Sequence, residues 1–340
     1  MKAAFCGSNG EFEISEYQPP KPGRGEVLLE VAYCGICGSD IHMVAFGLFP
    51  PGSIIGHEVS GSVAEAGEGV ENWRKGDRAV VLPFDYCSSC EMCRIGNNQL
   101  CVETISRSYG LGNTPGGFSQ FMLVKSSMLY RVPEGLDLKS AALNEPWSVA
   151  WHGVNLLNFQ PPAPVLVMGA GPIGLMSIYG LKSRGAENIF VSEPNSYRAE
   201  KAKAAGAKMV IDPTVTQPAS VILEQSGRAP VGVIDCAGSE SSLQDAVIAA
   251  GPRGQVVVLG LHMNNVYLTP LVCFGKEIQI NFSLGYNHKD FGEALQRLAQ
   301  GAVNPDVVIS DVVPLKEITQ AFQMLQKANH AKILIDCRQA

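Results

Sequence analysis

The pattern of hydrophobic and polar positions changes character near residue 145. Before that point, apolar residues alternate with polar ones over short runs, as in the segments 27–33 and 59–63, with Pro and Gly turns between them. Alternation with a period of two is typical of strands that bury one face. The first part of the chain is therefore predicted to be an irregular, mostly β domain.

From residue 165 onward, short apolar runs alternate with amphipathic helical patterns. The runs are VLVM (165–168), NIFVS (188–192), MVI (209–211), GVID (232–235) and QVVVLG (255–260). Strands that are apolar on both faces indicate a parallel sheet covered by helices on each side. Two further helical patterns after residue 286 predict helices that pack on a core. The fold class is predicted to be α/β, with a doubly wound parallel sheet beside a mostly β domain.

Composition limits the partners and the compartment. The chain has 340 residues, which at about 150 residues per domain indicates two domains. Its net charge is −6 and it has no basic block, so nucleic acid is not an expected partner. The N-terminal segment lacks the apolar core of a signal peptide, which predicts a cytoplasmic protein with reduced thiols.

One uncharged stretch, residues 161–181, is about as long as a membrane span of about 20 residues. Four prolines and four glycines interrupt it. Such breaks favour a loop, a buried strand and a helix over a spanning helix. No membrane association is expected.

Four cysteines close together form the most specific motif of the chain. Cys87, Cys90, Cys93 and Cys101 have the spacing C-x2-C-x2-C-x7-C. This spacing is typical of four thiolates around one zinc, a closed set that leaves no position for a substrate. Disulfides are the alternative, but they belong mainly to small secreted chains that cannot build a sufficient core. We therefore predict a structural zinc in a lobe near residues 85–103.

The segment GAGPIG at 169–174 predicts a nucleotide-binding turn, because it follows an apolar run and opens a helical pattern. The first glycine allows the tight turn, the second lets the backbone approach a pyrophosphate, and the third packs helix against strand. A proline near the helix start costs little, because its missing N–H has no partner there. The candidate cofactor-binding residues of this turn are Gly169, Gly171, Pro172, Ile173 and Gly174.

Glu193 ends the next predicted strand, where a carboxylate accepts hydrogen bonds from the adenosine ribose. It would repel a 2′-phosphate, which favours NAD over NADP. Arg198 is also a candidate, because it could reach a phosphate, although a solvated residue of a helix at 196–205 is the alternative. A dinucleotide-binding regulator would share these features, so they do not by themselves predict an enzyme.

A second group of residues has the character of an open metal site. Cys37 lies in CGICGSD, His57 and Glu58 lie in GHE, and Glu145 lies in NEPW. One thiolate, one imidazole and one or two carboxylates suit a zinc that keeps an exchangeable position for water or substrate.

The order of these motifs along the whole chain resembles that of the zinc-dependent medium-chain alcohol dehydrogenases. The resemblance implies a GroES-like catalytic domain made of residues 1–147 and 286–340, and a Rossmann coenzyme domain at 148–285. It also implies one catalytic and one structural zinc per chain. Cys37 and His57 would hold the catalytic zinc, with Glu58 or Glu145 completing the set. Glutamate at 145, where many members have cysteine, is similar to the sorbitol, threonine and butanediol dehydrogenase branch.

The resemblance also implies a proton path and an activity. Ser39 would accept the proton of the alcohol and His42 would pass it to solvent, although His42 is equally well read as an exposed histidine at a helix start. Asp40 resembles the carboxylate that orients a ligand histidine. The expected reaction is hydride transfer between a secondary alcohol, such as a diol or small hydroxy compound, and NAD, giving the ketone.

The substrate itself stays open. The sorbitol-like branch usually carries an arginine within the segment that matches 281–286, but this chain has Ser283 and none. The stretch SLGYNHKDF is closer to butanediol-type enzymes. Polyol and threonine dehydrogenases remain alternatives, as does a zinc-free, quinone-reductase-like or nucleotide-binding protein. Some large apolar residues could line the pocket or belong to the core: Trp147, Trp151, Phe46, Leu48, Leu111 and Leu284.

Assembly is implied by resemblance as well. The segment 272–282 matches an edge strand through which dimers of the family join their sheets, and some dimers pair into tetramers. Its alternating residues Ile278, Ile280 and Phe282 fit an exposed edge that needs a partner. We therefore expect a homodimer or homotetramer.

Overall fold

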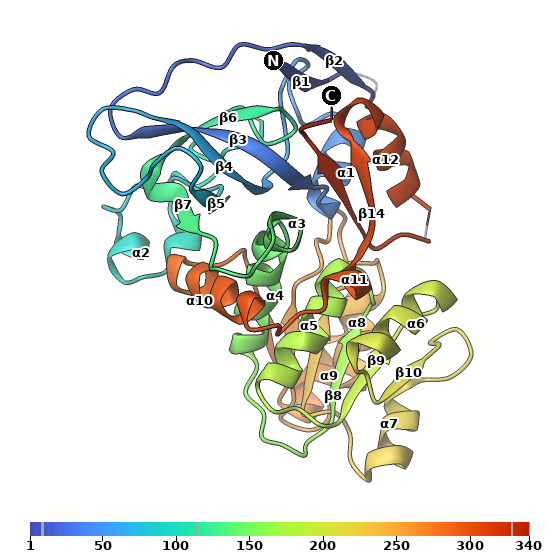
Figure 1. Cartoon of the computed structure of the whole chain (residues 1–340). Coiled ribbons are helices and arrows are strands. Elements are labelled where there is room, and N and C mark those ends of the chain that lie inside the picture. Colours follow the sequence, from blue (N-terminus) through green and yellow to red (C-terminus); the bar gives the residue numbers. More distant parts are fainter. Residues whose placement is uncertain (8–9, 113, 328, 340) are drawn as a thin grey trace. The chain divides into compact units, whose positions relative to one another are not determined.

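The computed structural model describes residues 1–7, 10–112, 114–327 and 329–339, and it divides into two compact units (Figure 1). The first unit combines Met1–Pro146, Tyr286–Gly301 and Ile309–Ala340, and the second combines Trp147–Gly285 and Ala302–Val308. Both ends of the chain thus belong to the first unit. The segment Ala302–Val308 lies with the second unit, although the resemblance places it in the catalytic domain.

The first unit is mostly β, as the alternating pattern predicts, and most of its strand pairs are antiparallel. A hairpin of β1 (Lys2–Cys6) and β2 (Phe12–Glu16) precedes a sheet in the order β14-β15-β3-β4-β5-β7, in which β6 also pairs with β3. The sheet strands are β3 (Glu26–Gly35), β4 (Glu58–Ala66), β5 (Arg78–Val81), β6 (Phe121–Lys125), β7 (Leu129–Arg131), β14 (Ile309–Pro314) and β15 (Lys332–Asp336). Val27, Leu29 and Val31 all point into the core of this unit.

Short helices connect these strands. They are α1 (Gly38–Ala45), α2 (Glu91–Arg94), α3 (Leu138–Ala141), α10 (His288–Ala299) and α12 (Ile318–Leu325), with the 3-10 turns η1 (Asn98–Leu100), η2 (Ser126–Met128) and η3 (Leu315–Glu317). Helices α10 and α12 bury the apolar residues that the periodicity singles out, including Phe291 and Phe322. The chain leaves the first unit along α4 (Asn144–Leu156).

The second unit contains the predicted parallel sheet. Its six strands lie in the order β10-β9-β8-β11-β12-β13, which is 3-2-1-4-5-6 in chain order, the arrangement of dinucleotide-binding Rossmann folds. The strands are β8 (Val165–Met168), β9 (Ile189–Ser192), β10 (Met209–Ile211), β11 (Gly232–Asp235), β12 (Gln255–Val258) and β13 (Gln279–Phe282). The helices are α5 (Pro172–Ser183), α6 (Ser196–Ala205), α7 (Pro218–Ser226), α8 (Ser242–Ala249), α9 (Pro270–Lys276) and α11 (Pro305–Val308).

The order of the strands in this sheet predicts where a ligand binds. The chain runs outward from β8 to β9 on one side and to β11 on the other, so the topology switches at β8. Ligands of such sheets bind outside the carboxyl ends of the strands at the switch point. The turn that follows β8 at Gly169 occupies this position.

The uncharged stretch 161–181 divides into the fully buried strand β8 and most of helix α5, as predicted. Within the described ranges, no helix combines the length and the apolar character needed to cross a membrane.

The segment 272–282 differs from the prediction. Only Gln279–Phe282 forms a strand, whereas Pro270–Lys276 forms helix α9. Proline at the first helical position favours a helix start, and the helix places Val272 and Cys273 against the core of the second unit. The expected eleven-residue edge strand is therefore wrong in its first half.

Candidate metal centres and nucleotide site

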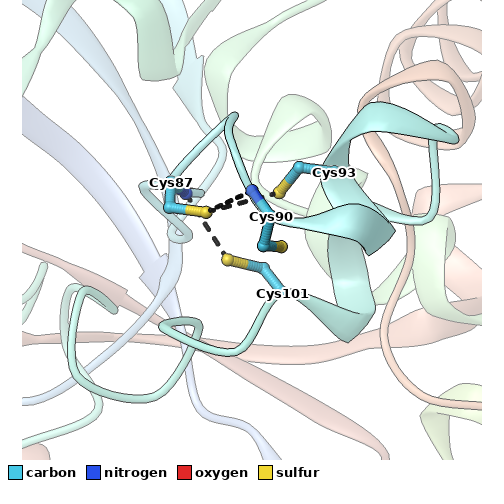
Figure 2. A group of neighbouring side chains, drawn as sticks. All are labelled: Cys87, Cys90, Cys93 and Cys101. Atoms are coloured by element: carbon cyan, nitrogen blue, oxygen red, sulfur yellow. Dashed lines mark hydrogen bonds between the residues drawn. The ribbon is translucent and has the colours of Figure 1, made fainter.

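The four cysteines of the lobe converge on one point (Figure 2). Cys87 and Cys93 have their sulfur atoms 3.9 Å apart. Thiolates at 2.3 Å from a tetrahedral zinc lie about 3.8 Å apart, so this spacing fits the ion. The lobe needs only local chain to do this, because Cys90 caps the short helix α2 and Cys101 ends the turn η1.

Backbone N–H groups point at the sulfur atoms of this lobe. Cys90 N donates to Sγ of Cys87 at 3.3 Å, and Glu103 N and Cys87 N each donate to Sγ of Cys101 at 3.4 Å. Such donors stabilise thiolates, and the backbone N–H and hydroxyl of Ser89 together with the N–H of Cys90 lower the pKa of Cys87 to about 6. The donor set and its surroundings therefore fit a structural zinc.

The second cluster joins Cys37, His57 and Glu58, which offer ligand atoms within 4.8 Å of one another. Cys37 lies at the N-cap of α1, and its backbone N–H donates to Oδ2 of Asp40 at 3.0 Å. The other oxygen of Asp40 lies 3.3 Å from Nδ1 of His57. A carboxylate behind a ligand histidine is the usual means of orienting the imidazole toward a metal.

The electrostatics of this cluster attract positive charge. Burial alone would lower the pKa of His57, but the Asp40 carboxylate and the Cys37 sulfur outweigh it and raise the pKa well above its usual value. His57, Asp40 and Glu58 are all buried. The residues thus fit a metal cation, since they form a mixed set of sulfur, nitrogen and oxygen donors.

Lys332 neutralises Glu58 inside the first unit. Its Nζ lies 2.5 Å from Oε1 and 2.8 Å from Oε2 of Glu58, and it also donates to the carbonyl of Ile36 at 2.8 Å. The neighbouring strand makes room for the carboxylate at Gly35, where an added Cβ would overlap Oε2 of Glu58. Each oxygen keeps a further lone pair, so Glu58 can accept from Lys332 and still face a metal.

Glu145 is the fourth candidate ligand, and it stands outside the 4.8 Å cluster. It lies in the first turn of α4, and its Oε1 accepts a hydrogen bond from the hydroxyl of Tyr286 at 2.7 Å. Burial raises the pKa of Glu145 to about 7, opposed by the charge of His57 and reinforced by that of Glu58. The charges of His57 and Glu58 thus act on this carboxylate, although it is not one of the three clustered residues.

The two relay candidates lie on one helix. Ser39 is half-buried in the first turn of α1, and His42 is exposed one turn later. Residues three apart on a helix share a face, so the serine and the histidine are neighbours along α1.

The glycine-rich turn has the geometry that its sequence predicts. Gly169 has a φ of 85°, which only glycine adopts freely, and an added Cβ at Gly174 would overlap the carbonyl of Gly169. Gly171 caps helix α5 and has open space around the position of a Cβ, as a backbone cradle for a phosphate requires. Pro172 and Ile173 form the first turn of the helix.

Glu193 is fixed directly beside this turn. Its Oε2 accepts from Ala170 N at 2.7 Å and its Oε1 accepts from Asn195 N at 2.9 Å. Arg198 donates its backbone N–H to the cap residue Asn195, while its buried Nε has no hydrogen-bond partner in the described residues. The two cofactor candidates thus lie at the same end of the sheet.

Most of the residues suggested as pocket lining are either buried in a core or exposed on the surface. Trp147 and Trp151 are buried in the second unit with their ring centroids 5.8 Å apart. Phe46, Leu48 and Leu284 are more than half exposed within the described structure. The two tryptophans are therefore core residues of the second unit. This is the second of the two roles that the sequence allows for them.

Sequence reasoning missed Lys332, Tyr286 and the need for Gly35. A lysine that begins an otherwise apolar strand, as in AKILID, is the one sequence signal that could have indicated a buried charge. Nothing in the sequence links Tyr286 to Glu145, because they are 141 residues apart.

Comparison with known proteins agrees with this architecture. The family model of the alcohol dehydrogenase GroES-like domain matches residues 23–134, and that of the zinc-binding dehydrogenases matches 172–300. The chain is 35% identical over 342 residues to the 2-dehydro-3-deoxy-L-galactonate 5-dehydrogenase of Pseudoalteromonas atlantica, with 99% of each protein covered. It is 30% identical to human sorbitol dehydrogenase, with 96% of this chain and 93% of that enzyme covered.

A solved structure extends the likeness to three dimensions. The rspB alcohol dehydrogenase of Escherichia coli CFT073, determined with NADH, has a TM-score of 0.91 and 30% identity, with 99% of both chains covered. The chain therefore belongs to the zinc-dependent medium-chain alcohol dehydrogenase family. It is an oxidoreductase with a GroES-like and a Rossmann domain, which confirms the predicted family, fold class and enzyme class.

Proposed function

We propose that the enzyme transfers hydride between a secondary alcohol of a diol or polyhydroxylated compound and NAD, giving the ketone. The observation that carries this proposal is the buried cluster of Cys37, His57 and Glu58 in a chain that also has the glycine turn of a dinucleotide site. The named relatives support it, because one is a sorbitol dehydrogenase and another was solved with NADH. The two units then act as catalytic and coenzyme domains.

The catalytic zinc would be held by Cys37, His57 and Glu58, with Glu145 beside the remaining position. Zinc bound there supplies Lewis acidity, which makes a substrate hydroxyl easier to deprotonate. Asp40 holds the imidazole of His57, and Lys332 balances the charge of Glu58. The structural zinc occupies the lobe of Cys87, Cys90, Cys93 and Cys101.

Ser39 and His42 would carry the released proton outward. Ser39 accepts it from the substrate hydroxyl, and the exposed imidazole of His42 exchanges it with water. Ser39→Ala should lower turnover about 10²-fold without loss of zinc, the lower end of general acid–base effects. Equal turnover in this variant would remove the relay.

The coenzyme would be NAD, with its pyrophosphate at Gly171 and the start of α5 and its adenosine ribose at Glu193. The Glu193 carboxylate is held in place by two backbone N–H groups, so it cannot turn away from a 2′-phosphate without losing them. Arg198 would contact the adenosine end of the coenzyme.

A homodimer would form through strand β13. This strand ends the six-stranded sheet, and within the described structure no other strand covers its outer edge. Phe282 on the strand and Phe274 on α9 are 71% and 82% exposed, which is costly for large apolar side chains. Phe282→Glu should yield monomers in size-exclusion chromatography with light scattering. The location would be the cytoplasm, where the ten cysteines, none of them in a disulfide bond, stay reduced.

A substrate screen tests the reaction directly. Secondary alcohols, diols and polyols are offered with NAD and with NADP, and the absorbance of the reduced nicotinamide is followed. We expect turnover with NAD, two zinc per chain, and loss of activity after chelation. A chain that carries one zinc, or that is active after losing the zinc at Cys37, would contradict the proposal.

A further inference from the structure

A chain of hydrogen bonds connects the four-cysteine lobe with Glu145. Tyr86 directly precedes Cys87, and its hydroxyl donates to the backbone carbonyl of Tyr286 at 3.0 Å. The hydroxyl of Tyr286 in turn donates to Oε1 of Glu145 at 2.7 Å. All of these residues belong to the first unit, although they come from three distant segments.

The path is buried along its whole length. Tyr286 is 0% and Tyr86 5% exposed. Each tyrosine hydroxyl donates its proton along this path, Tyr86 to the carbonyl of Tyr286 and Tyr286 to the carboxylate of Glu145. Hydrogen bonds in such surroundings are stronger than in water and costly to lose.

Aromatic packing restricts both tyrosines. The ring of Tyr286 stacks on Phe291 at 5.4 Å and meets Phe84 at 5.8 Å, and Phe84 stacks on Tyr86 at 5.8 Å. The Tyr286 hydroxyl therefore has little freedom to follow Glu145 if that carboxylate moves. Instead, the ring position decides which oxygen of Glu145 is held, and Oε1 is the oxygen that accepts the hydrogen bond.

We infer that Tyr286 is a positioning residue for Glu145, and that Tyr86 makes this position depend on the folded four-cysteine lobe. Zinc in the lobe thus contributes to the reaction by ordering the chain at Tyr86, without touching the substrate. The inference rests on the proposed function, because it assigns Glu145 a place beside the catalytic zinc.

The primary test is Tyr286→Phe, which removes one hydroxyl and leaves the ring packing. Tyr130→Phe is the matched control, because Tyr130 packs on the same Phe291 and bonds to His288 but not to Glu145. Zinc per chain after dialysis against graded chelator, the visible spectrum of cobalt(II) at the Cys37 site, kcat and KM are measured for each protein.

For Tyr286→Phe we expect a fall of about 10- to 100-fold in kcat or in retention of the catalytic zinc, as for other carboxylate partners around metals. The cobalt(II) spectrum should shift, while the KM for NAD and the lobe zinc stay unchanged. Tyr130→Phe should match the wild type in all of these. A wild-type spectrum and kcat in Tyr286→Phe would overturn the positioning role.

Tyr86→Phe tests the dependence on the lobe. It should reproduce the spectral shift in weaker form, and its effect should vanish in a Cys90→Ser background, because the path is already interrupted there. If the two changes add independently, the link to the lobe is wrong. Should Cys90→Ser not fold, an unshifted spectrum in Tyr86→Phe alone refutes the link. Failure of the wild type to bind metal at Cys37 would instead refute the proposed function.

Discussion

The two metal-binding clusters of the first unit are built in opposite ways. The lobe takes four cysteines from fifteen consecutive residues and stays close to the surface, with three of its four cysteines partly exposed. The other cluster takes Cys37, His57 and Glu58 from two distant segments and buries charged groups among strands of the sheet. The geometry of the lobe is set by residues close together in sequence. The buried cluster depends on the whole fold for the positions of its ligands and for the balance of their charges.

The largest expected effect comes from Cys37→Ser. Loss of the thiolate should lower kcat/KM about 10³-fold or more, because a bound metal supplies several kcal/mol of transition-state stabilisation and each 1.36 kcal/mol is a factor of ten. The melting temperature should change little, and one zinc per chain should remain in the lobe. Activity assays, calorimetry and metal analysis check this result.

Next in size is Lys332→Met, which leaves the carboxylate of Glu58 buried without its partner. Removing one partner of a buried ion pair should lower the free energy of unfolding by about 3–5 kcal/mol. Urea unfolding of the variant and the wild type measures this difference. Lys332→Met combined with Glu58→Gln should recover most of this loss, since no uncompensated charge remains. A destabilisation that the double variant fails to reduce would contradict the role given to Lys332.

Cys90→Ser should give the reverse of Cys37→Ser. The binding free energy of a structural zinc is part of the folding free energy, so the variant should lose the lobe zinc and melt several degrees lower. A smaller loss of turnover follows if the lobe orders Tyr86. An unchanged zinc count and melting temperature would mean that the lobe is not a structural metal site.

The smallest expected effect concerns the nucleotide site. Glu193→Ala should raise the KM for NAD about tenfold, because the carboxylate that orders the turn and meets the ribose is gone and Ala170 N loses its acceptor. Zinc content and the KM for alcohol should stay the same. Glu193→Gln serves as the control, since it keeps an oxygen for Ala170 while removing the repulsion of a 2′-phosphate. Unchanged preference for NAD over NADP in both variants would exclude the ribose contact.

Regular patterns made much of the fold predictable. The alternation at 27–33 identified β3, the apolar runs identified five strands of the parallel sheet, and the pattern after residue 286 identified α10 and α12. The prediction failed at 272–282, because β13 begins only at Gln279 and therefore includes Ile280 and Phe282 but not Ile278. Pro270 begins a helix there, and the contacts of Val272 and Cys273 with the core favour it over an extended edge.

The sequence by itself determined the lobe and the glycine turn, because all the atoms that define them lie within a few residues of one another. Local spacing then fixes the geometry, and the glycines at 169 and 174 are needed for backbone reasons alone. Only the tertiary structure decided how the buried centre is completed. Strand β15 brings Lys332 to Glu58, which lies 274 residues earlier, and Tyr286 bonds to Glu145, which lies 141 residues earlier. A buried charge needs a partner to be stable, and partners this distant in sequence are brought together only by the fold.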